Sequence, residues 1–216
     1  MKFSLSTNGW ESYGWHELFD AIRDAEFEGV ELHGISDSAL SGVGMPFSSE
    51  NINQTARSFS DIGMAIPCVD SLSDISLTDP DAINNAVYEI EECIAAARAL
   101  RCKYVRIHAC GEDKGEATDA AVRRMIRRLL PAAISQKVVL LVETTGVYSD
   151  TERLCELLNS FASDSVGALW DMHHPYRYCG ETPETTIQRL GAYVKHVHIK
   201  DSIRKSPGEV EFCLMG

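Results

Sequence analysis

Several features that define other classes of protein are missing from this sequence. No apolar run approaches the roughly 18 residues that a membrane span requires, and the amino terminus lacks the apolar core of a signal peptide. The seven cysteines are scattered and contain no Cys-x-x-Cys pair, which argues against a disulfide framework and against a zinc knuckle. We therefore expect a cytoplasmic protein with reduced thiols and no membrane partner.

Positive charge is also scarce. The chain has 20 Lys and Arg against 32 Asp and Glu, which gives a formal net charge of -12. Because binding to a phosphate backbone needs a basic surface, we expect no nucleic-acid partner. An acidic chain is compatible with a metal site, since hard cations prefer carboxylate oxygens. The 216 residues, of which 44% are hydrophobic, suffice for one domain with a sizeable core.

Short apolar runs alternate with amphipathic segments of helical length along the chain. Residues 79–80 are Asp-Pro, a strong signal for the start of a helix. No Gly-x-Gly-x-x-Gly follows the first strand, so a dinucleotide-binding fold loses its main support. The expected strands are 2–7, 30–34, 65–70, 104–108, 138–143, 168–171 and 194–198, and the expected helices are 15–28, 50–61, 80–97, 118–135, 151–161 and 183–190.

This alternation predicts parallel strands joined by right-handed crossovers. Seven strand–helix units favour a (β/α)8 barrel over an open sheet of five or six strands. A complete barrel has eight units and typically about 250 residues, whereas only residues 202–216 follow strand seven and its Asp201, with 209–214 as one strand of a hairpin. We therefore expect a single α/β domain over 1–216, a barrel truncated after strand seven that lacks strand eight and its helix.

Three of the expected strands end in a side chain that can bind a metal ion: Glu143, Asp171 and His198. Function in a (β/α)8 barrel resides at the carboxyl ends of the strands. A mixed set of Glu, Asp and His suits one divalent metal ion, Mn²⁺, Mg²⁺, Co²⁺ or Zn²⁺. The plainer alternative is that each is a buried polar residue with its own hydrogen-bond partner. Because all three occupy successive strand ends, we favour the metal site.

Other polar residues near strand ends carry weaker signals. His108 ends strand four and is either a substrate contact or a structural histidine. Glu31 is expected to be a buried partner of a neighbouring strand end. His173 and His196 are expected to point away from the barrel interior, because side chains alternate along a strand.

The chain resembles the xylose isomerase-like barrel superfamily of sugar phosphate isomerases and epimerases, which is also related to endonuclease IV. The resemblance covers nearly the whole chain in order and spacing. The motifs that carry it are Gly29-Val30-Glu31-Leu32, Val142-Glu143, Trp170-Asp171-Met172-His173-His174-Pro175 and His196-Val197-His198-Ile199-Lys200-Asp201.

The resemblance implies roles for individual residues. Glu143, Asp171 and His198 match three of the family's four metal ligands. His174 matches a histidine that contacts a substrate oxygen, and Arg204 matches an arginine that holds one. The fourth ligand, a glutamate at the end of strand eight that also transfers protons, has no counterpart here.

The implied reaction is isomerisation or epimerisation of a sugar or sugar derivative. Removal of a proton next to a carbonyl gives an enediolate, which a divalent cation stabilises. Glu143 would act as ligand and base, His174 as a second catalytic contact, and Trp10 as an apolar platform for the sugar. The superfamily also contains dehydratases and hydroxy-acid isomerases, so the reaction type stays open.

Two alternative functions remain. An endonuclease IV-like metallonuclease needs further histidines at the ends of strands two to four to hold three zinc ions, but strand three ends in Cys68-Val69-Asp70 and the chain is acidic. A non-catalytic truncated barrel that acts within an assembly is the other. Because a missing strand leaves unprotected edges on strands one and seven, we predict a homodimer that covers them.

Overall fold

The computed structural model describes residues 2–8, 15–35, 45–206 and 209–216 of the chain. Seven parallel strands form one sheet in which every strand pairs with its neighbour in sequence. The strands, in their order along both the chain and the sheet, are β1 Ser4–Ser6, β2 Gly29–His33, β3 Cys68–Asp74, β4 Tyr104–His108, β5 Val139–Glu143, β6 Val166–Asp171 and β7 Val194–His198.

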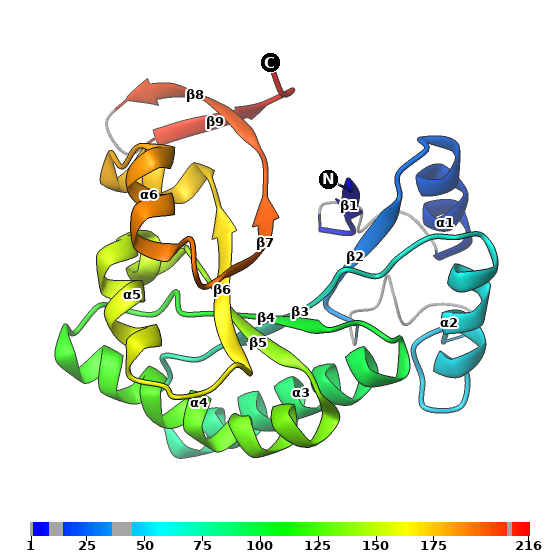
Figure 1. The fold of residues 1–216 in the computed structure, drawn as a ribbon, viewed down its shortest axis with the longest axis horizontal. Coiled ribbons are helices and arrows are strands. Elements are labelled where there is room, and N and C mark those ends of the chain that lie inside the picture. Colours follow the sequence, from blue (N-terminus) through cyan, green and yellow to red (C-terminus); the bar gives the residue numbers. More distant parts are fainter. Residues whose placement is uncertain (1, 9–14, 36–44, 207–208) are drawn as a thin grey trace.

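A helix connects each strand of the sheet to the next and lies on the outer side of the curl (Figure 1). Asp79 caps one of them as expected, since its side chain accepts a hydrogen bond of 2.9 Å from Ala82 N. All six predicted helices are confirmed with small shifts of their ends. They are α1 Trp15–Asp24, α2 Ile52–Asp61, α3 Pro80–Ala99, α4 Glu116–Gln136, α5 Thr151–Asn159 and α6 Pro183–Leu190.

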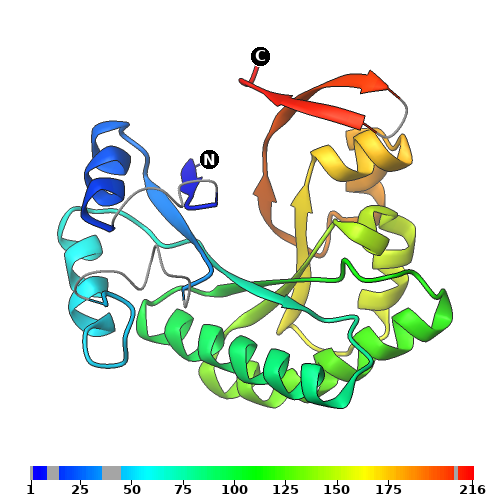
Figure 2. The ribbon, with the colours of Figure 1, turned by 180° about the vertical axis from the view of Figure 1, so that it is seen from behind.

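The sheet curls so that β7 and β2 face each other across its centre, as both views show (Figures 1 and 2). Among the described residues, β1 pairs only with β2 and β7 only with β6. A sheet of this kind, with helices outside, corresponds to seven of the eight strands of a TIM barrel. The predicted fold class is confirmed. Within the described part of the chain, no helix is long and apolar enough to cross a membrane.

An antiparallel hairpin follows β7. It consists of β8, Asp201–Ser206, and β9, Glu209–Cys213, and confirms the hairpin strand predicted at 209–214. Figure 1 shows the hairpin beside α6, beyond the end of β7. It is a separate two-stranded sheet and adds no strand to the parallel one.

Alternation of side chains along the strands separates two layers. On β4, Val105 and Ile107 belong to the large core between sheet and helices, whereas Tyr104 packs with a small cluster on the other face. That inner cluster consists of Cys68, Val139, Leu141 and Leu169. The inner face continues toward the carboxyl ends with polar residues two positions after Cys68, Tyr104, Leu141 and Leu169, namely Asp70, Arg106, Glu143 and Asp171.

Candidate metal centre

The carboxyl ends of β5, β6 and β7 bring three polar side chains together. Glu143, Asp171 and His198 each place a ligand atom within 4.8 Å of the other two. Oε1 of Glu143 lies 3.2 Å from Nδ1 of His198. The two carboxylates are 3% and 1% exposed, and a charge at such a depth is costly unless a cation or hydrogen bonds compensate it. The three side chains that the sequence selected therefore meet at one point.

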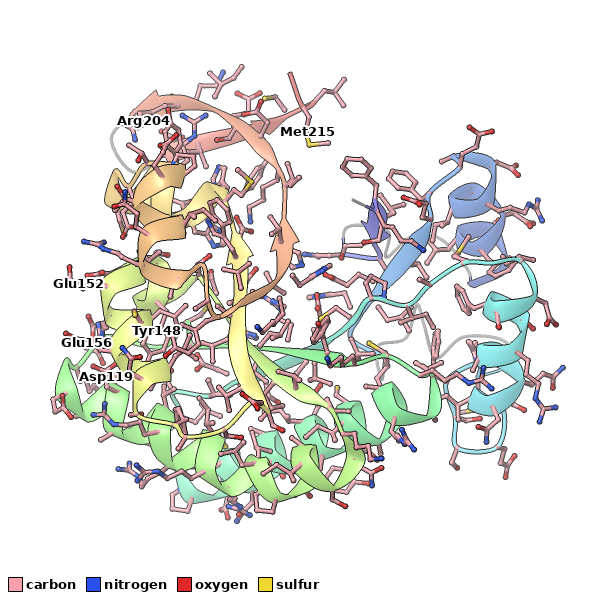
Figure 3. All side chains as sticks on the ribbon, in the orientation of Figure 1. Asp119, Tyr148, Glu152, Glu156, Arg204 and Met215 are labelled. Atoms are coloured by element: carbon pink, nitrogen blue, oxygen red, sulfur yellow. The ribbon has the colours of Figure 1, made fainter. Side chains whose placement is uncertain are left out.

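Backbone and hydroxyl contacts fix the ends of β5 and β6 against each other. The hydroxyl of Thr144 donates to the carbonyl of Asp171 at 3.0 Å and accepts from its backbone N–H at 2.9 Å. Further along, the fully buried Tyr148 donates to Asp119 of α4 at 2.9 Å (Figure 3). The segment that follows Glu143 is thus tied to both β6 and α4, so the two carboxylates occupy defined positions.

Arg106, on the inner face of β4, is paired with Glu143. Its Nη2 and Nε donate to Oε2 of Glu143 at 2.7 and 3.1 Å. Burial alone would raise the pKa of Glu143, but the hydrogen bond from His198 and the charge of Arg106 outweigh it and lower that pKa to about 2. Sequence reasoning missed Arg106. The signal was present, because Arg106 is a charged residue in an apolar strand and lies two positions before His108, so both side chains point to the same face of β4.

Lys200 occupies the corresponding place beside Asp171. Its Nζ lies 2.7 Å from Oδ2 of Asp171 and 2.9 Å from Nε2 of His174. Because the carbonyl of Thr144, 3.1 Å from Nδ1 of His174, only accepts hydrogen bonds, Nδ1 carries the proton and Nε2 accepts from Lys200. Burial lowers the pKa of His174, and the Lys200 charge acts in the same direction. His174 is therefore a neutral imidazole, and Lys200 is a second residue that sequence reasoning missed.

Glu31, on β2, holds the two histidines of β7. Its carboxylate oxygens lie 2.6 Å from Nε2 of His196 and 2.7 Å from Nε2 of His198. Glu31 is buried and pairs with a strand end, as expected, but that strand is β7, which is not the neighbour of β2 in the sheet that the sequence led us to expect. The expectation that His196 points away from the interior is wrong, because it is two residues from His198 and both share one face of β7.

The charge on His198 follows from these contacts. Burial alone would lower its pKa, but hydrogen bonds to Glu143 and Glu31 raise it from 6.5 to about 10. Burial raises the pKa of Glu31, and its bonds to His196 and His198 more than reverse this, so that its pKa is low. In the absence of a bound cation, His198 is an imidazolium held between two carboxylates.

Asp70, on β3, adds a further carboxylate to the inner face. Its Oδ2 lies 3.3 Å from Nδ1 of His33, whereas its Oδ1 is buried and has no hydrogen-bond partner among the described residues. Burial, together with the charge of Glu31, raises the pKa of Asp70. The inner face therefore retains an unsatisfied acceptor next to the carboxylates already described, which favours a bound cation or hydrogen-bond donor in this region.

The remaining predicted site residues are distributed differently. His108 ends β4, is half-buried, and has a buried Nδ1 without a hydrogen-bond partner in the described part of the chain. Arg204 is exposed on the β8–β9 hairpin and donates to the carbonyl of Arg177 at 3.1 Å (Figure 3). Trp10 lies outside the described residues. The buried His173 bonds through Nε2 to Ser202 Oγ at 2.7 Å, as a structural histidine would.

The donor set matches a divalent cation. Glu143, Asp171 and His198 offer carboxylate and imidazole donors close enough to bind one ion, and this mixture suits Mn²⁺, Mg²⁺, Co²⁺ or Zn²⁺. Arg106 and Lys200 pair with the same carboxylates, so they neutralise charge that an ion would otherwise neutralise. Three protein donors would leave further coordination positions of such an ion open.

Several solved structures are similar to this one. The IolI protein with a bound zinc atom has a TM-score of 0.82 and 18% identity, over 96% of this chain and 76% of that chain. The probable 3-DHS dehydratase AsbF of Bacillus anthracis has a TM-score of 0.79 and 20% identity, over 94% of this chain and 74% of that chain. D-psicose 3-epimerase in the presence of D-fructose has a TM-score of 0.75 and 12% identity, over 92% of this chain and 72% of that chain. At these identities the likeness shows the fold.

Comparison at the level of sequence gives the family. No curated protein matches the chain. The family described as xylose isomerase-like TIM barrel matches residues 19–211, which includes all three strand ends of the candidate centre. This chain belongs to the xylose isomerase-like TIM barrel family.

Proposed function

We propose that the protein binds one divalent cation through Glu143, Asp171 and His198 and isomerises or epimerises a sugar or sugar derivative. The observation that carries this proposal is the convergence of the three ligand atoms within 4.8 Å at the carboxyl ends of adjacent strands, where barrel enzymes place their active sites. Epimerases acting on D-psicose and on a 3-keto-D-glucoside, and the zinc-containing IolI protein, are among the similar structures and support it.

In the proposed reaction, Glu143 accepts the proton from the carbon next to the substrate carbonyl, and the electron pair of the broken C–H bond forms an enediolate. Return of a proton to the neighbouring carbon gives the isomer, and its delivery to the opposite face of the same carbon gives the epimer. Arg106 keeps the Glu143 carboxylate deprotonated, but the low pKa of Glu143 also makes this carboxylate a weak base. One bound divalent cation would supply the Lewis-acid withdrawal of electron density from substrate oxygens that acidifies the carbon-bound proton.

The neighbouring side chains would orient the substrate. His174 and Lys200 lie beside Asp171 and offer an imidazole and an ammonium group to substrate oxygens. We retain His108, with its unpartnered Nδ1, as a third contact. Lys200 takes the role that the resemblance assigned to Arg204, because Arg204 faces solvent on the hairpin.

Metal analysis tests the centre directly. Bound metal is measured in wild-type protein and in Asp171→Asn and His198→Ala, with Asp79→Asn as the matched control, since Asn caps a helix as well as Asp. We expect one cation per chain in the wild type and the control and loss in the two site variants. Equal metal content in all four proteins would contradict the proposal.

A substrate screen tests the reaction. Ketohexoses, pentuloses and inososes are incubated with the protein and Mn²⁺, Mg²⁺, Co²⁺ or Zn²⁺, and products are separated by chromatography. A dehydratase is among the similar structures, so products of water loss are assayed too. Turnover that depends on the cation and is lost in Asp171→Asn would support the proposal, and turnover that persists with a chelator would contradict it.

We also propose that the protein is a cytoplasmic homodimer. All seven cysteines are free thiols, which supports a reducing compartment. Among the described residues β7 has a partner strand on one side only, and its outer residue Val197, the following Ile199 and Phe212 on the hairpin are exposed. A second copy that pairs with this edge would cover them.

A further inference from the structure

One contact joins opposite sides of the curled sheet. Glu31 of β2, which is 2% exposed, reaches His196 and His198 of β7, although β2 and β7 are separated by four strands in the sheet. The residues are 165 and 167 positions apart in sequence. Figures 1 and 2 show the two strands facing each other across the centre, so the contact crosses the interior of the barrel.

The chemistry of this contact fixes where the histidine protons lie. A carboxylate only accepts hydrogen bonds, so each Nε2 that lies 2.6 or 2.7 Å from Glu31 must donate. The two imidazole rings meet edge to face, with centroids 5.5 Å apart and an interplanar angle of 84°. Both rings are therefore oriented by one side chain that uses both of its oxygens.

Fixing Nε2 as the donor directs the other nitrogen of His198. Its Nδ1 lies 3.2 Å from Oε1 of Glu143, and a cation bound between Glu143 and His198 would replace the proton that Nδ1 carries in the metal-free imidazolium. Histidines that bind metal ions commonly donate their second nitrogen to a carboxylate, which fixes the tautomer and raises ligand basicity. We infer that Glu31 is a positioning residue that holds His198 with Nε2 protonated and Nδ1 directed toward Glu143 and the cation.

This inference rests on the proposed function, since it assigns Nδ1 of His198 to a cation. A purely structural role for Glu31, in which it only ties β2 to β7, is the competing explanation. The two differ in what a substitution changes. A structural tie affects the free energy of unfolding alone, whereas a positioning residue also changes the cation affinity of the folded protein.

The first test is a Mn²⁺ titration by calorimetry of wild type, Glu31→Gln and Glu181→Gln. Glu181 is a matched control, because its side chain is 8% exposed, it pairs with Arg189 and it accepts from Thr151, all outside the candidate centre. A Gln at 31 has one acceptor oxygen, so one histidine loses its partner. We expect Glu31→Gln to bind Mn²⁺ about 10- to 100-fold more weakly, and Glu181→Gln to bind like wild type.

The second test needs no variant and no metal. Nitrogen chemical shifts of the histidine rings report which nitrogen carries a proton, and both Nε2 atoms of β7 are expected to be protonated in the metal-free wild type. An unprotonated Nε2 on either histidine would overturn the inference, even if Glu31→Gln failed to fold.

The outcomes separate the two claims. Equal Mn²⁺ affinity in wild type and Glu31→Gln, with only the unfolding free energy reduced, overturns the positioning role and leaves the proposed function standing. Wild-type protein that binds no Mn²⁺ overturns the proposed function and the inference together. Weaker binding in Glu31→Gln with protonated Nε2 atoms supports both.

Discussion

The candidate centre joins two differently supported regions, the buried pair β5 and β6 and the edge strand β7. Every residue of β5 and β6 is buried, whereas β7 alternates between partly buried and exposed residues. Both β5 and β6 have a strand on each side and helices behind them, while β7 has a partner strand only on the β6 side within the described residues. All three nevertheless end in a candidate ligand.

The difference shows that the ligands are held by different physical means. Glu143 and Asp171 follow strands that the hydrophobic core fixes, with Thr144 bonding the two strand ends together. His198 lies at the end of a strand that, in the described part of the chain, pairs only with β6, and its ring is held by hydrogen bonds to Glu31 and Glu143. Changes to the core should therefore act through global stability, and changes around β7 should act on the site itself.

The largest expected effect is a loss in the free energy of unfolding when the buried strand β5 is changed. Leu141 of β5 is fully buried in the inner cluster beneath the centre, and Val197 of β7 is 38% exposed. Leu141→Ala should lower the free energy of unfolding by about 2–5 kcal/mol, because it leaves a cavity. Val197→Ala should cost less than about 1 kcal/mol. Urea unfolding of both variants tests this, and similar losses would show that β7 is supported like β5.

A pH titration addresses the hydrogen bonds around β7. In metal-free protein the pKa of His198 is about 10, above its ordinary value of 6.5. Its contribution to stability is therefore complete below pH 6.5 and is lost as the pH rises through 10, at up to roughly 1.4 kcal/mol per pH unit. Urea unfolding between pH 6.5 and 10 should show this decline in the wild type and a flatter profile in His198→Asn. Parallel profiles would mean that His198 is not charged.

Replacement of Lys200 should change affinity and turnover in opposite directions. Lys200→Met removes a cation that lies 2.7 Å from Asp171 Oδ2, so Mn²⁺ should bind about 10-fold more tightly as charge repulsion falls. Turnover should fall, because the substrate loses an ammonium contact. Lys205→Met is the control, since Lys205 pairs with Glu211 on the hairpin. Unchanged Mn²⁺ affinity in Lys200→Met would show that the Lys200–Asp171 pair does not compete with the cation.

The smallest expected effect concerns the open edge of β7. If a second copy covers this edge, Val197→Lys should weaken association severalfold by placing a charge in the interface. Size-exclusion chromatography with light scattering should give a dimer for wild type and more monomer for the variant. A monomeric wild type would contradict the homodimer.

Local patterns predicted most of the fold because its elements are strongly periodic. Alternating apolar runs and helical stripes located the seven strands and six helices, and Asp79-Pro80 marked the start of α3. The meeting of Glu143, Asp171 and His198 also followed, since parallel strands place their carboxyl ends at one edge.

The contacts that determine the charges of the side chains in the candidate centre could not be predicted from the sequence. Arg106 and Lys200 were missed because their pairing with Glu143 and Asp171 depends on how strands pack, which no local pattern records. The bond from Glu31 to His196 crosses the barrel between residues 165 positions apart. The direction of His196 was the one avoidable error, because a spacing of two from His198 already places both on one face.

A crystal structure with Mn²⁺, located by its anomalous scattering, tests the central claim most directly. The account predicts one ion bound to Glu143, Asp171 and Nδ1 of His198, with Nε2 of His198 still bonded to Glu31. An ion at another group of side chains, or Arg106–Glu143 and Lys200–Asp171 pairs that persist without an ion at saturating Mn²⁺, would contradict it.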